Sequence, residues 1–196
     1  MSIPFITIDD RQYRPEIMQA CEERLDDMCR SCARVFLVRF DVHYPIGYLA
    51  PSSNELCSEL LRLFREYFTN HTTKTHYVAV REQGQSNSPH YHIAFFVDGS
   101  KFDNGYTIWH RAAETWCRIV GPEAAGYVHW CKTFTDDGGL KIERPRRNST
   151  GSRLCHEQLA FETARQQAMT WLLYLSKTAT KGSAPFKVKE FFCSRL

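Results

Sequence analysis

The chain has 196 residues, of which 43% are hydrophobic and 24% charged, and this balance is typical of a globular domain with a sizeable core. No apolar run is long enough to cross a bilayer, and the first ten residues lack the basic and then apolar pattern of a secretory signal. Composition therefore argues against secreted and membrane-spanning proteins and predicts a cytoplasmic protein with no membrane partner.

Positive charge is concentrated in the last third of the chain. From Lys132 onward there are 12 Lys and Arg residues against 6 Asp and Glu residues, whereas the preceding residues hold 13 and 16. A basic segment attached to a near-neutral domain is suited to a phosphate backbone. The eight cysteines are scattered, which predicts reduced thiols; Cys29 and Cys32 form a lone CxxC that we interpret as packing, with a zinc or redox site as the alternative.

The first two elements are a helix and a strong strand. Within residues 1–33, apolar residues recur at helical spacing along a narrow face, which predicts a surface helical extension packed on the main domain, residues 34–196. Residues 34–44 then alternate strictly. One face of this strand is wholly apolar, and the other becomes polar at Arg39, Asp41 and His43.

Further elements follow from the same patterns. We expect a helix from about 54 to 68, strands over 76–82 and 90–97 joined by a turn, a helix over 107–120, a strand over 127–132, a loop or hairpin extension over 135–152, a helix over 155–178 and a tail.

This order predicts an α+β fold of the ferredoxin/RRM-like split β-α-β type, with a central antiparallel sheet, an N-terminal helix and a C-terminal tyrosine-bearing helix. In such sheets the first and third strands are central neighbours, so residues 34–44 should lie beside residues 90–97. We expect the helices to cover the apolar face and to leave the face with the polar groups open.

Two histidines stand two positions apart at the start of the strand that begins at residue 90. Because alternate side chains of a strand share a face, His90 and His92 point the same way while Tyr91 points to the other side. Two imidazoles on one side of a rigid strand can form half of a divalent-metal site, although two surface histidines would give the same pattern.

Tyr174 and Lys177 are three residues apart in the last predicted helix and so lie on one side of it. A nearby ammonium group and a metal-bound phosphate could activate a phenol as a nucleophile. The alternative is a core tyrosine with a lysine that extends beside it to solvent.

Together, His-x-His on a central strand and Tyr-x-x-Lys on a late helix resemble the HUH superfamily of single-stranded-DNA endonucleases. The order, with the histidines first, is that of its replication-initiator branch. Residues 39–45, 174–181 and 192–195 are more closely similar to the YagK/YfjJ C-terminal-domain family, whose members include replication proteins of filamentous phages (inoviruses). The similarity covers about residues 34–195.

The resemblance implies a rolling-circle replication initiator that binds Mg²⁺ or Mn²⁺ through His90 and His92. Glu82 is the expected third ligand because it should lie opposite His90 across the turn, and Asp41 and His43 are the alternatives.

Tyr174 would attack the scissile phosphate, which would leave a 5′-phosphotyrosine and a free 3′-OH primer end, and Lys177 would orient or neutralise the charge. Only one tyrosine lies at this position of the helix, which favours single-tyrosine chemistry.

The expected partner is single-stranded DNA at an origin or hairpin, bound by a monomer in the bacterial cytosol, together with the host helicase or polymerase. Trp109 and Trp130 are available for base stacking, with core packing as the alternative. The predicted DNA-binding residues are Arg39, Arg144, Arg146, Arg147, Arg153, Lys181, Lys187 and Lys189.

Three other functions remain open from the sequence. An HUH transposase or other mobile-element nickase would use the same residues. A non-catalytic ferredoxin-like nucleic-acid-binding module, or a polymerase-palm relative such as a primase, would share the fold, although a palm needs paired carboxylates and Asp41 has no obvious partner. A cupin-type metalloenzyme also uses His-x-His, but several helices do not suit a barrel.

Overall fold

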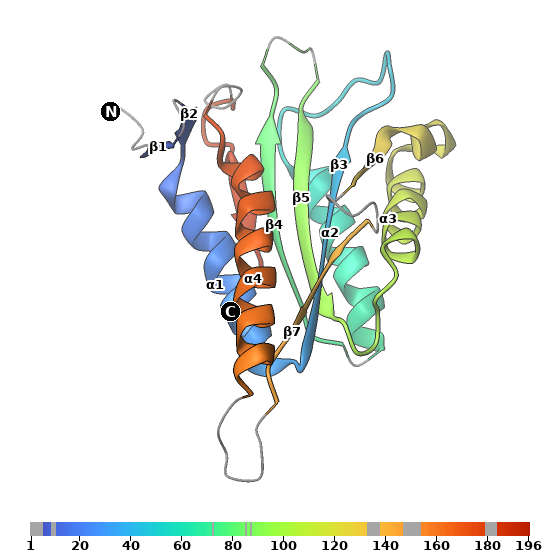
Figure 1. Ribbon diagram of the computed structural model, residues 1–196. Helices are drawn as coiled ribbons and strands as arrows, with labels where there is room; N and C mark the ends of the chain where they lie inside the picture. Colours follow the sequence, from blue (N-terminus) through green and yellow to red (C-terminus); the bar gives the residue numbers. More distant parts are fainter. Residues whose placement is uncertain are drawn as a thin grey trace.

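The computed structural model describes residues 6–8, 11–71, 73–84, 86, 88–132, 138–146, 154–178 and 184–196. Its centre is a six-stranded antiparallel sheet in the order β6-β3-β5-β4-β8, with β7 also pairing with β3 (Figure 1). The elements in chain order are β1 (Ile6–Ile8), β2 (Arg11–Tyr13), α1 (Pro15–Ser31), β3 (Arg34–Val42), α2 (Glu55–Asn70), β4 (Thr75–Glu82), β5 (His90–Asp98), α3 (Gly105–Val120), η1 (Pro122–Tyr127), β6 (Val128–Cys131), β7 (Leu140–Glu143), α4 (Cys155–Leu172), η2 (Leu173–Ser176) and β8 (Phe191–Cys193).

The middle of the sheet is formed by β3, β5 and β4. Strand β5 pairs with β3 so that His92 lies opposite Asp41, and with β4 so that His90 lies opposite Glu82. This confirms the α+β class and the predicted neighbourhood of the first long strand and the histidine strand. Because paired residues point to the same face, the register brings the polar ends of three strands together.

One face of the sheet packs on α2 and α3 (Figure 1). Phe40 of β3 and Phe95 of β5 point into this core, where the centre of the Phe95 ring lies 4.6 Å from that of Phe64 on α2. Trp116 of α3 is fully buried in the same cluster. The alternation of residues 34–44 therefore predicted the apolar face of this strand correctly, since every second side chain enters this core.

The opposite face is not open, and that expectation is wrong. Helices α1 and α4 pack on it, so the sheet is covered from both sides (Figure 1). The physical reason is that only one end of this face is polar. Leu37 and Phe96, further along the same strands, are fully buried there, and apolar sheet area of this size must be removed from water.

Helix α1 is correspondingly more than a surface helix. Ile17, Leu25 and Met28 are completely buried against the sheet. Its Pro15 occupies the first helical turn, where a missing backbone N–H costs nothing. Six of the seven charged residues of the helix are at least partly exposed, and this charge suggested a surface helix, whereas the seventh, Arg24, is buried.

The two ends of the chain meet other elements near the polar end of the sheet. Strand β8, which we did not predict, adds to the edge of β4. Tyr13 of β2 forms a backbone bridge with Lys177, and the Arg14 amide donates to the Ser176 carbonyl at 2.8 Å. Tyr13 and Arg14, near the N-terminus, therefore hold the turn that carries Tyr174.

Two predictions made from composition can be compared with the structure. Among the described residues, none of the helices combines the length and the apolar character needed to cross a bilayer. All eight cysteines are free thiols, as their scatter predicted. Cys29 and Cys32 are both buried, and burial raises the pKa of each thiol, which agrees with a packing role.

Candidate metal and tyrosine site

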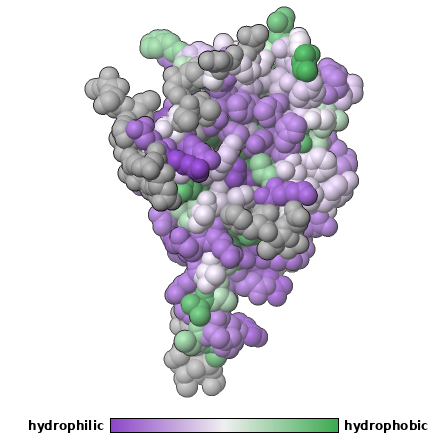
Figure 2. All heavy atoms as spheres, turned by 45° about the horizontal axis from the view of Figure 1, so that its top comes forward, coloured by the Kyte–Doolittle hydropathy of each residue, from purple (hydrophilic) through white to green (hydrophobic). Residues whose placement is uncertain are grey.

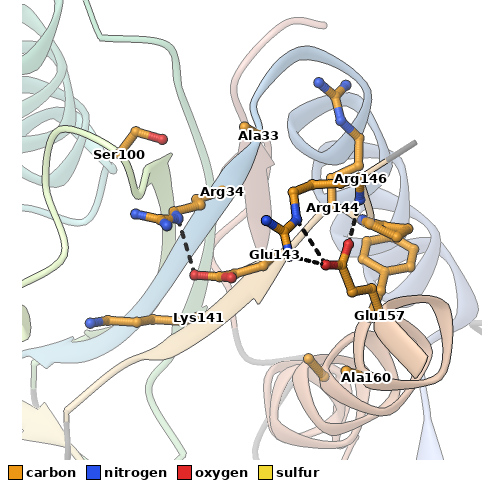
Figure 3. A pocket seen from close by; sticks show the side chains of 12 residues that line it. Ala33, Arg34, Ser100, Lys141, Glu143, Arg144, Arg146, Glu157 and Ala160 are labelled. Atoms are coloured by element: carbon orange, nitrogen blue, oxygen red, sulfur yellow. Dashed lines mark hydrogen bonds and ion pairs between the residues drawn. The ribbon is translucent and has the colours of Figure 1, made fainter. Parts of the chain in front are cut away.

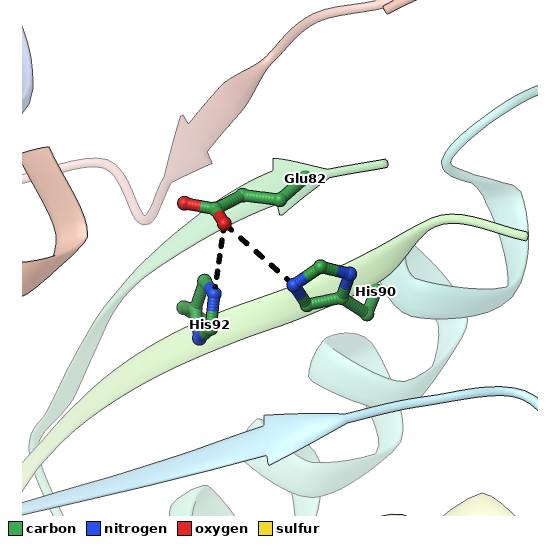
Figure 4. A group of neighbouring side chains, drawn as sticks. All are labelled: Glu82, His90 and His92. Atoms are coloured by element: carbon green, nitrogen blue, oxygen red, sulfur yellow. Dashed lines mark ion pairs between the residues drawn. The ribbon is translucent and has the colours of Figure 1, made fainter. Parts of the chain in front are cut away.

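Glu82, His90 and His92 form a compact group at the polar end of β4 and β5. One ligand atom from each residue lies within 4.8 Å of the others (Figure 4). The Glu82 Oε2 atom is 3.2 Å from His92 Nε2 and 3.6 Å from His90 Nε2. The structure therefore brings together the two histidines and Glu82, which the sequence indicated as the preferred third ligand.

Asp41 lies behind His92 rather than within this group. Its Oδ1 atom is 2.7 Å from His92 Nδ1, the ring nitrogen that faces away from Glu82. Burial alone would raise the pKa of Asp41, but the contact with His92 and the charge of Arg39 bring it below its ordinary value. A carboxylate on the second nitrogen of a ligating histidine fixes its tautomer and orientation, as in many metal sites.

The surroundings of His92 fit a bound cation. Although both ring nitrogens approach carboxylates, neither makes a well-aligned hydrogen bond within the described part of the chain, and the side chain is only 4% exposed. Buried polar atoms of this kind normally have a partner. A divalent ion at Nε2 would provide one.

The donor set narrows the choice of metal. Two imidazoles and one carboxylate suit Mn²⁺, Fe²⁺ or Zn²⁺, whereas Mg²⁺ prefers oxygen ligands alone and would rely on water and phosphate to complete its shell. In the ion-free site, burial lowers the pKa of His92, but Asp41 and Glu82 overcome this effect and raise it. A metal ion that binds at Nε2 would have to displace the proton that this nitrogen carries in the charged imidazole.

His43, the other alternative ligand, belongs to a stack of imidazoles beside the group. Its ring lies parallel to that of His90, with 4.8 Å between centres and an interplanar angle of 3°, and the ring of His129 meets its edge at 5.0 Å. Burial, together with the nearby His90 and His129, lowers the pKa of His43 to about 4. His43 is therefore neutral at neutral pH and packs behind a ligand.

His129 is a further imidazole beside the group that was not predicted from the sequence. It lies on β6 directly opposite Asp41 of β3. The signal was available, because the predicted strand over 127–132 places His129 on the face opposite to Trp130. What was missing was the pairing of that strand with β3.

Tyr174 lies against the candidate metal group, which is formed by Glu82, His90 and His92. Its ring meets that of His92 edge to face, with 5.2 Å between centres, and its side chain is 40% exposed. Helix α4 tightens into the 3₁₀ turn η2 at this point. Lys177 directly follows this turn, so the predicted helix ends before it, and its Nζ lies 4.3 Å from the centre of the Tyr174 ring.

The electrostatic environment of Tyr174 disfavours ionisation as long as no cation is bound. Burial, and then the carboxylates of Asp41 and Glu82, raise the pKa of the phenol, whereas Arg39 lowers it. A divalent ion held by Glu82, His90 and His92 would supply positive charge beside the phenol and reverse this balance.

Arg39 lies between the sheet and η2, the turn that contains Tyr174. It is 5% exposed, its guanidinium carbon lies 4.6 Å from the ring centre of Tyr174 and 5.3 Å from that of Trp171, and Nη1 donates to the Trp171 carbonyl at 2.9 Å. Its side chain is thus engaged with the helix, whereas the sequence suggested a contact with DNA.

The described part of the predicted basic loop, residues 138–146, contains β7, which pairs with the first half of β3 at the other end of the sheet. Arg144 and Arg146 line a groove of about 630 Å³ (Figure 3). Arg146 pairs with Glu157, and Arg144 Nη1 donates to the Arg30 carbonyl at 2.7 Å. This groove includes Arg34, seven residues before Asp41 on β3, which corresponds to a distance of about 23 Å along the strand.

The remaining predicted DNA-binding residues are less informative. Lys187 and Lys189 are exposed in the segment before β8. Arg147, Arg153 and Lys181 lie outside the described residues. The end of the molecule turned forward in Figure 2 is mostly hydrophilic, with separate apolar spots. DNA contacts by all of these residues stay predictions.

The fold and the site together define an α+β protein with a candidate His-His-Glu metal centre at the end of an antiparallel sheet and a tyrosine beside it. The chain belongs to the YagK/YfjJ C-terminal domain family, whose model matches residues 6–194. The match includes α1, and so it extends further than the resemblance seen in the sequence. Neither the curated proteins nor the solved structures contain a significant match.

Proposed function

We propose that this protein is an HUH-type endonuclease that nicks single-stranded DNA and becomes joined to it through Tyr174. The observation that carries the proposal is the contact between the Tyr174 ring and His92, a member of the group that could hold a cation. The strand order β6-β3-β5-β4, with α2 and α3 as connections, supports the ferredoxin/RRM-like architecture expected of such enzymes.

A cation held by His90, His92 and Glu82 would supply Lewis-acid chemistry and a template for the scissile phosphate. The Tyr174 oxygen would form a bond to phosphorus as the bond from phosphorus to the 3′ oxygen breaks. One phosphodiester replaces another, so the DNA can later be rejoined. The phenol proton would pass to solvent, which reaches the 40% exposed side chain, and the released 3′ oxygen would take up a proton from solvent.

Positive side chains would support the developing charge. Lys177 and Arg39 both lie within 5 Å of the centre of the Tyr174 ring. Charges held beside a reacting group before the reaction stabilise its transition state with little reorganisation.

The resemblance to filamentous-phage proteins supports a role as replication initiator. In that role the released 3′-OH would prime rolling-circle synthesis by the host polymerase, and the protein would act in the bacterial cytosol as a monomer with a helicase as a further partner. A transposase or other mobile-element nickase would use the same site and differ in the DNA end that it joins.

Covalent capture tests the proposal. Wild-type protein is incubated with Mn²⁺ and a panel of single-stranded and hairpin oligonucleotides, and adducts are separated under denaturing conditions and mapped by mass spectrometry. We expect a DNA fragment on Tyr174 that disappears with chelator, in Tyr174→Phe, and when His90 and His92 are both replaced by Ala. Tyr48→Phe, which changes a half-buried tyrosine elsewhere, is the matched control and should form the adduct normally.

Two outcomes would reject this mechanism. An adduct that persists in Tyr174→Phe would assign the nucleophile elsewhere. Binding of every oligonucleotide without any adduct would favour the non-catalytic nucleic-acid-binding module.

A further inference from the structure

A second concave site lies on the other side of edge strand β6. It is a hollow of about 550 Å³ between the start of α3 and the strands β6 and β7. Its aromatic lining residues are Phe36, Tyr106 and Trp130, and the ring centres of Tyr106 and Trp130 are 6.3 Å apart. Tyr106 is 55% exposed, so its ring is accessible to a ligand.

Close backbone packing shapes the floor of the hollow. A Cβ atom on Gly105 would lie 2.7 Å from the Gly138 carbonyl oxygen, and one on Gly139 would lie 2.3 Å from Cζ of Phe36. The Trp130 indole nitrogen donates to the same Gly138 carbonyl at 2.9 Å. The absence of side chains at these glycines allows this close packing, and the hydrogen bond fixes the plane of the tryptophan.

A second tryptophan, Trp109, also fixes the position of the Trp130 indole. The ring of Trp109 stacks on that of Trp130 at 6.0 Å with an interplanar angle of 13°, and its indole nitrogen donates to the Val128 carbonyl at 2.9 Å. Trp130 is therefore a preorganised stacking surface that need not lose further rotational freedom when a planar ligand binds.

The rim of the hollow is polar. Asp103, Asn104 and Lys141 line it, and Lys141 Nζ lies 3.1 Å from the Asp103 carboxylate. Carboxylate and amide groups can hydrogen-bond to the edges of bases, whereas a lysine can contact a phosphate. An exposed tyrosine and a half-buried tryptophan with such a rim match a nucleotide in which the base has left its stack.

Strand β6 connects this hollow to the metal group. Adjacent residues of a strand point to opposite faces: His129 contacts His43 in the histidine stack, and the next residue, Trp130, lines the hollow. Since β6 ends the strand order of the described sheet, a nucleic-acid strand can pass over it from one face to the other.

We infer that this hollow binds an unstacked base of single-stranded DNA, a few nucleotides away from the phosphate at the metal group. The inference rests on the proposed function for the identity of the ligand. It adds a second point of contact that would set the position of the cleavage site relative to a recognised base.

Affinity measurements with matched variants test this inference. Fluorescence anisotropy with labelled single-stranded oligonucleotides, in the presence of chelator so that no covalent adduct forms, compares wild type with Tyr106→Ala, Tyr106→Phe and Leu159→Ala. Leu159 is 66% exposed on α4 and provides the control for loss of an exposed apolar side chain. We expect Tyr106→Ala to weaken binding about fivefold or more, while Tyr106→Phe and the control remain within twofold of wild type.

Photocrosslinking locates the contact independently. An oligonucleotide substituted in turn at each position with 5-bromodeoxyuridine should crosslink at one position to a peptide that contains Tyr106 or Trp130. Equal affinities for Tyr106→Ala and Leu159→Ala, crosslinks that map only to other segments, or tighter binding of RNA than of DNA would each overturn the inference.

The covalent assay separates this inference from the proposed function. If Tyr174 forms an adduct but Tyr106→Ala binds normally, the hollow inference fails alone. If no adduct forms while the crosslink and the affinity loss are found, the proposed chemistry fails and the base-binding hollow stands.

Discussion

The guanidinium carbon of Arg39 lies 4.6 Å from the centre of the Tyr174 ring. Arg39 comes from the central strand β3 and Tyr174 from the turn that ends α4, so this contact fixes the tyrosine relative to the sheet that carries the histidines. A cation over an aromatic face is attractive, and the attraction increases when water is excluded.

Replacement of Arg39 should affect chemistry more than DNA binding. Arg39→Gln removes the charge beside Tyr174 and shortens the side chain that donates to the Trp171 carbonyl, so we expect the adduct to form up to about 100-fold more slowly. Single-turnover adduct formation, measured beside anisotropy with the same oligonucleotide, checks this. Arg111→Gln is the control, because Arg111 stacks on Tyr67 at 4.0 Å, away from the site. Equal rates in the two variants would remove Arg39 from the mechanism.

Metal affinity should distinguish ligands from their supports. We expect His90→Ala, His92→Ala and Glu82→Gln each to abolish tight Mn²⁺ binding in calorimetric titrations. Asp41→Asn should retain binding with about 10- to 100-fold lower affinity, because it changes only the group that orients His92.

The control for this series is His110→Ala, which changes an exposed histidine on α3 outside the group. It should bind Mn²⁺ as wild type does. If Asp41→Asn abolished binding as fully as His92→Ala, Asp41 would be a direct ligand and Glu82 would lose that assignment.

Acid should destabilise the ion-free protein through His43. Its pKa is lowered to about 4 by burial and by the neighbouring His90 and His129, whereas an unfolded histidine titrates near 6.5. Between these values the unfolded chain binds the additional proton, so the His43 contribution to the free energy of unfolding decreases as pH falls from about 6.5 to 4.

His43→Phe keeps an aromatic ring against His90 but cannot be protonated. Urea denaturation in the presence of chelator at several pH values should therefore show a smaller loss of stability between pH 6.5 and 4 in this variant. The raised pKa of His92 acts in the opposite direction, since its contribution is present below pH 6.5 and is lost as pH rises through the folded value. An unchanged pH dependence in His43→Phe would contradict the assignment.

The fold was largely predictable because local pattern and burial agree in the central strands. The alternation of residues 34–44 and the spacing of His90 and His92 correctly indicated strand pairing and a shared face. The predicted place of Glu82 opposite His90 needed only the assumption of a regular hairpin.

Features that depend on distant pairing could not be predicted in this way. Strand β8 is only three residues long, and its role follows from the exposed edge of β4 rather than from its own sequence. The covering of the second face by α1 depends on Leu37 and Phe96, whose shared side becomes clear only when β3 and β5 are paired. His129 and the buried position of Arg39 were missed for the same reason.

A buried hydrogen-bond network joins the C-terminal segment to β4 and α1, and it leads to a prediction about stability. His76 Nδ1 lies 2.7 Å from Ser194 Oγ, and Nε2 lies 2.7 Å from the Asp27 carboxylate, so one imidazole on β4 connects the C-terminal segment to α1. Ser194 and His76 are 2% and 3% exposed.

Ser194→Ala leaves one buried nitrogen of His76 without its partner, which should lower the free energy of unfolding by about 1–3 kcal/mol. Urea denaturation at pH 7.5 measures the change. Ser100→Ala, at an exposed turn after β5, is the matched control and should be near neutral. Because the network lies away from Tyr174, the folded Ser194→Ala protein should still form the covalent adduct; loss of the adduct without loss of stability would show that the C-terminal segment has a direct part in the site.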